Sequence, residues 1–328
     1  MRHVISAVTA AAAIMAAPIA SASTLTDAYS SFWVLGDSLS DNGNLLEATG
    51  QPPFPYFNGR FSNGPVWNES IIQEFVDAGN QPGVVGAPGF GSFEGNFAYG
   101  GARTSGANAQ GPIPGLDEQV GLFQAFTNGA RGDNPLVSVW AGANNIFQDL
   151  DQPGVRRTGR QAANDVAASI VALSALGVND FVVFNLPDIG QSPSYLGTGR
   201  DARRATRASN AFNERLDRRL GRLERNRGLN IIEIDIFSIF EDITNNPGAF
   251  GYSNITDQCI QNLTNGLCNP SDWLFWDGVH PTAGVHELIN QIVRDEIEGS
   301  LSTVPLPASG LLLVFGMGGL LLMRRRSA

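Results

Sequence analysis

The chain has 328 residues, 43% of them hydrophobic, and carries 21 basic residues against 31 acidic ones, a net charge of −10. Every basic residue is an arginine. Affinity for nucleic acid depends largely on basic side chains that meet phosphates, so this acidic balance argues against a nucleic-acid partner.

The first residues have the pattern of a secretion signal. Met1-Arg2-His3 is a short basic start, residues 4–19 are apolar and rich in alanine, and Ala20-Ser21-Ala22 has the small-x-small pattern that signal peptidase recognises. We expect a signal peptide over residues 1–22. A buried N-terminal helix is the alternative, but the alanine padding and the small residues at the end argue against it.

Residues 23–303 are long enough for one large domain with a substantial core. This body holds 17 basic against 31 acidic residues, a net charge of −14. We see no repeat, charge block or linker that divides it, so a second domain is not required.

Short apolar runs alternate with helical patterns along this body. The strand candidates are residues 31–35, 136–140, 181–184 and 231–236, and the helix candidates include residues 159–176, 201–225 and 282–298. This alternation predicts an α/β fold in which helices cover a parallel sheet. Ligands of such sheets bind at the carboxyl ends of the strands, where Ser38, Asn144 and Asp188 are expected.

Two motifs at opposite ends of the body supply a nucleophile and a base. Ser38 lies in Gly36-Asp37-Ser38-Leu39, and Asp277 and His280 lie in Asp-Gly-Val-His-Pro. A serine hydroxyl becomes nucleophilic when an imidazole takes its proton and a carboxylate orients that imidazole. The other histidine of the body, His286, falls in the predicted last helix, where a structural or solvent-facing role is expected.

Acyl transfer also needs hydrogen-bond donors for the oxyanion. The glycine pair Gly100-Gly101 would let a backbone N–H approach a substrate unhindered. Asn144 places an amide side chain just past a predicted strand. Both segments are candidates for an oxyanion hole.

Ten arginines lie between Arg200 and Arg227. Interleaved acidic residues, such as Asp201 and Glu214, favour a solvated helix with ion pairs between residues i and i+4. An anion-binding face is the alternative.

Cys259 and Cys268 are the two cysteines of the chain. Their closeness in an exported protein favours a disulfide, which would contribute about 2–3 kcal/mol on the chain-entropy model. A zinc site would need further ligands nearby, and the neighbouring sequence offers none.

The C-terminal end has the pattern of an anchor. Val304-Pro305-Leu306-Pro307-Ala308 leads into an apolar run over residues 310–323, which is followed by Arg324-Arg325-Arg326. This order resembles the PEP-CTERM class of sorting signals, which implies recognition by an exosortase, transient membrane anchoring and release at the surface or matrix of a Gram-negative bacterium. We therefore assign residues 304–328 as a sorting signal, with a plain tail anchor as the alternative.

Four blocks in order resemble the SGNH/GDSL hydrolase family over about residues 32–292. They are serine in Gly-Asp-Ser-Leu, glycine in Asn-Phe-Ala-x-Gly-Gly, asparagine in Gly-x-Asn and histidine in Asp-x-x-His-Pro-Thr. The α/β-hydrolase alternative expects Gly-x-Ser-x-Gly, but Ser40 occupies the last position.

The resemblance implies a flavodoxin-like three-layer α/β/α sandwich with a five-stranded parallel sheet, and ester hydrolysis without cofactor or metal. It also implies Ser38 as nucleophile, Asp277 as orienter and His280 as base. The oxyanion donors would be the N–H of Ser38, an N–H of Gly100 or Gly101, and the Asn144 amide. The continuation Gly101-Ala102-Arg103-Thr104 favours Gly101. Asn145 stands where the family usually has an aspartate after the oxyanion asparagine. We interpret that aspartate as a residue that supports the loop.

Our leading hypothesis is therefore an exported serine esterase or lipase that works through a covalent acyl-enzyme. A catalytically inert binding protein at the cell surface or matrix is the alternative. The motifs leave the ester itself open among short-chain esters, phospholipids and acetylated sugars.

Overall fold

The computed structural model describes residues 24–80, 95–106, 108, 111, 113–127 and 131–302. The predicted signal peptide and sorting signal lie outside these residues. Within the described ranges, no helix is long and apolar enough to cross a membrane.

Four parallel strands form the sheet, in the order β1-β2-β3-β4. They are β1 (Ser31–Gly36), β2 (Pro135–Trp140), β3 (Asp180–Phe184) and β4 (Asn230–Ile234). All four strands expected from the apolar runs are confirmed. Helices after β1, β2 and β3 return the chain to the start of the next strand, as parallel pairing requires.

The prediction of a fifth strand is wrong for the described residues. The segment 95–99 lies along the free side of β1 and exchanges backbone hydrogen bonds with Val34 and Gly36, but it forms a single bridge, Val34 with Asn96. Beyond it, the side chain of Asn44 donates to the carbonyl oxygens of Asn96 and Ala98, both at 2.9 Å. The Asn44 side chain thus occupies the outer edge of the segment, and the inner edge pairs with β1 through that one bridge.

Helices cover both faces of the sheet. Their bounds are α1 (Leu25–Ala28), α2 (Asn44–Thr49), α3 (Glu69–Asp77), α4 (Leu116–Thr127), α5 (Ala143–Asp149), α6 (Val155–Ala175), α7 (Arg200–Arg227), α8 (Ile236–Asn245), α9 (Cys259–Asn262) and α10 (Ala283–Ser302). Two short 3-10 helices are η1 (Ile189–Gln191) and η2 (Pro247–Phe250). The three helices expected from the sequence are confirmed as α6, α7 and α10, with α6 beginning four residues earlier than predicted.

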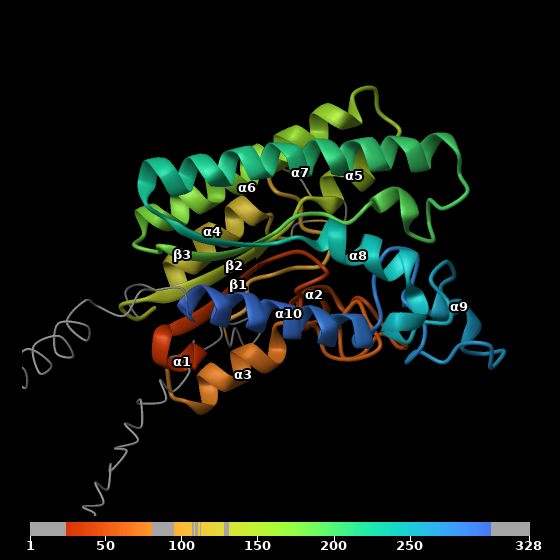
Figure 1. Ribbon diagram of the computed structural model, residues 1–328, viewed down its shortest axis with the longest axis horizontal. Coiled ribbons are helices and arrows are strands. Elements are labelled where there is room, and N and C mark those ends of the chain that lie inside the picture. The colour runs from red at the N-terminus through yellow and green to blue at the C-terminus, as the bar shows by residue number, and fades with distance from the viewer. Residues whose placement is uncertain are drawn as a thin grey trace, which may run out of the picture.

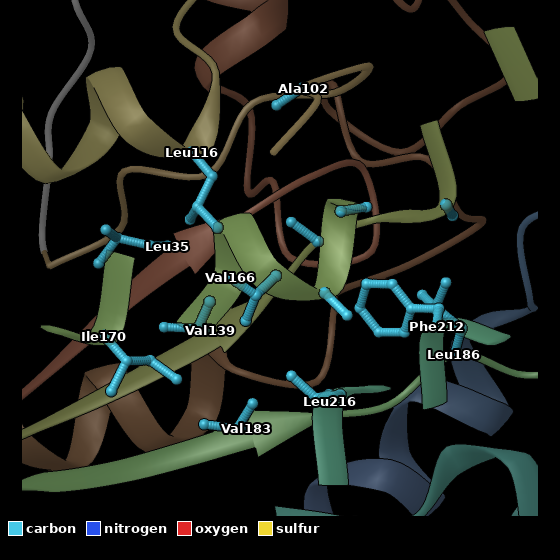
Figure 2. Close-up of a cluster of buried hydrophobic side chains, with 14 of the residues drawn as sticks. Leu35, Ala102, Leu116, Val139, Val166, Ile170, Val183, Leu186, Phe212 and Leu216 are labelled. Carbon is cyan, nitrogen blue, oxygen red and sulfur yellow. The ribbon is translucent and has the colours of Figure 1, made fainter. Parts of the chain in front are cut away.

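The result is a three-layer arrangement. Helices α4, α6 and α7 lie on one face of the sheet, and α1, α3 and α10 lie on the other (Figure 1). Alternate residues of each strand point to opposite faces. Trp33, Val137 and Val183 therefore join the core beneath α6 and α7, part of which is drawn in Figure 2, whereas Phe32 and Phe184 join the core beneath α3 and α10.

Candidate active site

The serine motif forms a tight turn directly after β1. A Cβ on Gly36 would lie 2.4 Å from the carbonyl oxygen of Trp140, so the close approach of β1 to the end of β2 requires glycine here. The turn closes with the N–H groups of Ser40 and Asp41 donating to the carbonyl oxygen of Asp37, both at 3.0 Å. Ser38 is thereby held at the carboxyl edge of the sheet, where it keeps 7% of its surface exposed.

The structure brings Ser38, His280 and Asp277 together as the sequence predicted. Nε2 of His280 lies 2.7 Å from Oγ of Ser38, and Nδ1 of His280 lies 2.7 Å from Oδ2 of Asp277. With the proton on Nδ1, the imidazole donates to the carboxylate and its Nε2 can accept the serine proton. The geometry is that of an activated serine nucleophile.

Asp277 is held as an ionised carboxylate. Its Oδ1 accepts hydrogen bonds from the N–H groups of Val279 at 2.9 Å and His280 at 2.8 Å. Burial by itself raises the pKa of this carboxyl, but the charge of His280 and the hydrogen bonds from His280, Val279 and Tyr56 outweigh burial and lower the pKa to about 2.

Tyr56 is a site residue that the sequence analysis did not assign to the triad. Its hydroxyl donates to Oδ2 of Asp277 at 2.7 Å, the same oxygen that faces Nδ1 of His280. The Tyr56 ring packs edge-on against Phe61 and Trp276. No local motif identifies it, because 221 residues separate Tyr56 from its partner.

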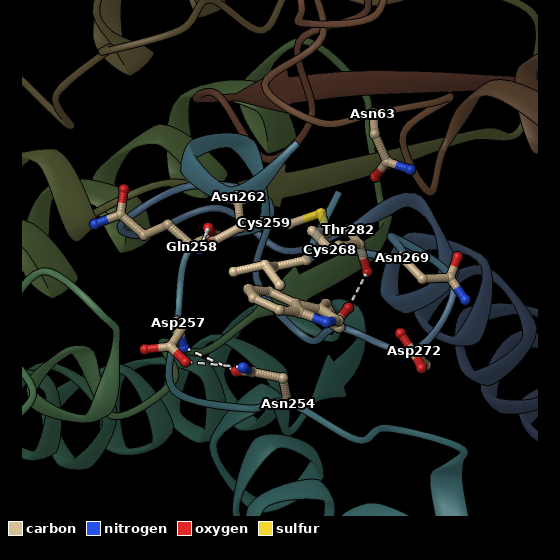
Figure 3. Close-up of a disulfide and its surroundings, with 12 residues drawn as sticks. Asn63, Asn254, Asp257, Gln258, Cys259, Asn262, Cys268, Asn269, Asp272 and Thr282 are labelled. Atoms are coloured by element: carbon tan, nitrogen blue, oxygen red, sulfur yellow. Dashed lines mark hydrogen bonds between the residues drawn. A yellow bond between two sulfur atoms is a disulfide. The ribbon is translucent and has the colours of Figure 1, made fainter. Parts of the chain in front are cut away.

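The predicted disulfide between Cys259 and Cys268 is present (Figure 3). Cys259 packs with Trp273 and Trp276, and Tyr56 lies against this cluster. The N–H groups of Cys259 and Ile260 donate to the carbonyl oxygens of residues 275 and 276. The disulfide loop therefore braces the segment that leads directly into Asp277.

The structure distinguishes between the two candidate glycines. The Gly100 N–H donates to Oδ2 of Asp41 at 2.7 Å, and a Cβ on Gly100 would lie 2.1 Å from the Phe61 ring. Gly101, in the left-handed region with φ of +79°, lines a cavity together with Ser38 and Asn144. Among the described residues, the N–H groups of Ser38 and Gly101 have no hydrogen-bond acceptor. Gly101, as the sequence favoured, is the glycine left free to donate.

Asn144 lies in the first turn of α5 and lines the same cavity. Its Nδ2 donates to the carbonyl oxygen of Ala102 at 3.1 Å and makes a long contact of 3.4 Å to Oδ2 of Asp37. The adjacent Asn145 is buried, and its Oδ1 accepts the Thr104 N–H at 3.0 Å. Asn145 thus supports the glycine loop as an acceptor, the role expected of the family's aspartate.

Two buried carboxyl groups flank the serine. Burial raises the pKa of Asp37 to about 7, against the opposing effects of the Leu39 N–H and the charge of His280. Burial also raises the pKa of Asp41 to about 6, although four backbone N–H groups, including that of Gly100, act to lower it.

Ser38 and His280 lie between two cavities. One, of about 330 Å³, contains the free N–H groups and is also lined by Phe61, Phe147 and Gln148. The other, of about 410 Å³, is mostly apolar. Its apolar lining includes Trp140, Phe147, Ile189, Leu196, Phe237, Phe240, Ile255, Phe275 and Val279.

Two further residues singled out from the sequence have other surroundings. Asp188 lines the apolar cavity, but its Oδ1 accepts the Gly190 N–H at 2.9 Å and the Thr206 hydroxyl at 2.7 Å, so it caps η1. His286 is buried in α10, and within the described structure neither of its ring nitrogens has a hydrogen-bond partner. Burial, followed by the charge of His280, lowers the pKa of His286 to about 3. His286 is therefore neutral and does not contact Ser38.

In the described part of the chain, no group of three or more histidine, cysteine or acidic residues is placed to hold a metal ion.

Comparison with known proteins places this chain in a family. Residues 33–293 match the GDSL-like lipase/acylhydrolase family. The chain is 28% identical to the thermolabile hemolysin of Vibrio parahaemolyticus serotype O3:K6 over 78% of its own length and 60% of the hemolysin. It is 30% identical to the phosphatidylcholine-sterol acyltransferase of Aeromonas hydrophila, over 83% of this chain and 91% of that protein.

Solved structures are more distant. An acetylxylan esterase from Geobacillus stearothermophilus is 12% identical, with a TM-score of 0.42 over 81% of this chain and 93% of the esterase. The lipase/acylhydrolase from Enterococcus faecalis is 16% identical, with a TM-score of 0.40 over 82% of this chain and 96% of that structure.

The chain belongs to the GDSL-like lipase/acylhydrolase family. It is a carboxylic ester hydrolase.

Proposed function

We propose that this protein is an exported serine esterase that cleaves esters of apolar acyl chains through a covalent acyl-enzyme. The observation that carries the proposal is the continuous hydrogen-bonded line from Asp277 through His280 to Ser38, beside two backbone N–H groups that have no acceptor among the described residues. A nucleophile, a base and donors for the developing charge are the three parts that acyl transfer requires.

In the proposed reaction, Oγ of Ser38 attacks the ester carbonyl carbon while Nε2 of His280 takes the hydroxyl proton. The N–H groups of Ser38 and Gly101 and the amide of Asn144 stabilise the oxyanion. The alcohol leaves with the proton from His280, and the acyl group remains on Ser38. A water molecule then repeats the sequence, His280 again acting as base, and the carboxylic acid is released.

Replacing the nucleophile tests the proposal directly. The purified full chain is expected to hydrolyse p-nitrophenyl esters, and Ser38→Ala is expected to lose at least about 10³-fold in kcat, because the acyl-enzyme cannot form. Steady-state release of p-nitrophenol measures the loss, and circular dichroism checks that the variant is folded. Turnover by Ser38→Ala at the wild-type rate would contradict the mechanism.

A fluorophosphonate probe separates this proposal from the inert binding protein. The probe should label Ser38 in the wild type and leave Ser38→Ala unlabelled. Folded wild-type protein that the probe does not label would favour the inert alternative.

Tyr56 is proposed as a positioning residue for Asp277. Tyr56→Phe keeps the ring packing and removes one hydrogen bond to a charged group, so kcat should fall about tenfold with KM nearly unchanged. The same hydrogen bond helps to depress the pKa of Asp277 below its ordinary value. The stabilisation that this depressed pKa gives is present above about pH 4 and is lost as the pH falls toward 2.

Tyr56→Phe should therefore show a smaller acid-dependent loss of unfolding free energy over that pH range, measured by urea titration. Phe61→Leu, which perturbs the ring cluster but keeps the Tyr56 hydroxyl, is the matched control and should retain the wild-type pH dependence. An unchanged kcat and an unchanged pH dependence in Tyr56→Phe would reject the assignment.

The apolar cavity beside Ser38 supports an acyl chain longer than acetyl. Aromatic and aliphatic side chains from the ends of β2, η1 and α8 line its volume of about 410 Å³. Burying an acyl chain there gains about 0.8 kcal/mol for each CH₂ removed from water. The name of the Aeromonas relative, which states acyl transfer between phosphatidylcholine and sterol, agrees with a lipid acyl substrate.

Across p-nitrophenyl esters from acetate to dodecanoate, kcat/KM is expected to rise with chain length until the chain fills the cavity. Thr244 lies in the cavity wall on α8, so Thr244→Trp should move the optimum to shorter chains. Asp242→Trp, an exposed position on the same helix that does not line the cavity, should keep the wild-type optimum. If kcat/KM of the wild type were highest for the acetate ester, the acyl chain would not bind in this cavity.

We further propose export, with signal peptidase cleavage after Ala22 and exosortase-type processing of residues 304–328, which support a location in the periplasm, at the cell surface or in the matrix. Mass spectrometry of the protein released by its native host should find an N-terminus at Ser23 and no peptide from the arginine-ended tail. An intact N-terminal segment on the mature protein would reject the signal peptide.

A further inference from the structure

Five arginines line one surface hollow on the side of the molecule that carries α6 and α7. The hollow has a volume of about 690 Å³, and its charged lining consists of Arg156, Arg200, Arg203, Arg204, Arg207 and Asp151. Five positive groups and one negative group give this lining a net charge of +4, in a chain whose net charge is −10. The local charge is thus opposite to that of the whole protein.

None of these arginines forms an ion pair with a described residue. In the described part of the chain none of the five has a carboxylate within 4.0 Å, and α7 forms no ion pair along its length. The i to i+4 pairs that the sequence favoured for this helix are therefore absent there. Arg204 donates one hydrogen bond, to the carbonyl oxygen of Gln152 at 2.5 Å.

The backbone adds to the positive potential. Helix α6 comes after β2 and α5, and α7 comes after β3 and η1; the first residues of both helices line the hollow. The partial positive charge of a helix N-terminus disfavours arginine and favours anions. The first turn of α6 holds no acidic residue, and Asp201, the acidic residue in the first turn of α7, does not line the hollow. A bound anion would offset the repulsion between these arginines and the positive ends of the two helices.

The hollow adjoins the wall of the apolar cavity. The rings of Phe147 in α5 and Tyr195 before α7 stack with their centroids 6.0 Å apart. This contact holds the end of α5 beside the chain that leads into α7. Phe147 and Leu196 line the apolar cavity, and a few residues further along the same two segments Asp151 and Arg200 line the hollow.

We propose that this arginine hollow is a binding site for phosphate groups. The planar guanidinium fork matches phosphate oxygens two at a time, and five such forks with a net lining charge of +4 suit more than one phosphate. The phosphates come either from a free phosphate or pyrophosphate ion or from the headgroups of anionic phospholipids. Binding does not require Ser38, so the site is independent of the proposed hydrolysis.

The test compares two double variants of the full chain on the same helix. Arg203→Gln/Arg207→Gln removes two exposed arginines of the hollow, and Arg218→Gln/Arg222→Gln removes two exposed arginines with the same spacing outside it. Two measurements are made on each variant. Isothermal titration measures binding of phosphate and pyrophosphate. Co-sedimentation measures binding to phosphatidylcholine vesicles with or without phosphatidylglycerol. Circular dichroism checks that both variants fold.

The wild type is expected to bind pyrophosphate or the phosphatidylglycerol vesicles, and Arg203→Gln/Arg207→Gln should bind about tenfold or more weakly. The control variant should bind like the wild type. Phosphate should also raise the Tm of the wild type but not that of Arg203→Gln/Arg207→Gln. Binding confined to the free ions identifies a soluble ligand, and vesicle binding that needs phosphatidylglycerol identifies a headgroup.

Three results would overturn the assignment. They are no binding by the wild type in either measurement, equal losses in the two double variants, and wild-type affinity in Arg203→Gln/Arg207→Gln.

Discussion

The active site depends on one buried carboxylate, that of Asp41. Its two oxygens accept the N–H groups of Gly43, Asn44 and Leu45 at the start of α2, and that of Gly100 from the glycine loop. A buried carboxylate is tolerated when backbone donors surround it in this way. Because Asp41 lies three residues after Ser38, this contact fixes the glycine loop against the serine turn and leaves Gly101 as the residue whose N–H faces the cavity.

The histidine side of the site is braced separately. The disulfide loop is hydrogen-bonded to residues 275 and 276, and Trp276 packs against Tyr56, whose hydroxyl reaches Asp277. Asp277 receives its other donors from the backbone of its own turn. Ser38 is therefore held by the sheet and His280 by a cross-linked loop, and the two halves meet at the 2.7 Å contact between these two side chains.

Two cavities meet at this contact. In the proposed reaction, the cavity lined by Ser38 and Gly101 would hold the charge that develops on the carbonyl oxygen, and the apolar cavity would hold the hydrocarbon chain. The arginine hollow lies past the wall formed by Phe147 and the chain beside Tyr195. A phosphate-bearing lipid carries both an apolar chain and an anionic group, which are the two kinds of group that these proposed sites would bind.

The sequence by itself determined the parallel α/β fold, its four strands and main helices, the disulfide, and the motifs that hold the candidate site residues Ser38, Gly100, Gly101, Asn144, Asp277 and His280. These were predictable because apolar periodicity and short motifs are local. Tertiary structure alone decided that segment 95–99 pairs as a single bridge rather than a fifth strand, that Tyr56 reaches Asp277, and that five arginines converge on one hollow without an ion pair to any described residue. The physical reason is that each depends on contacts between segments distant in the chain, where side-chain hydrogen bonds and helix packing decide which groups meet.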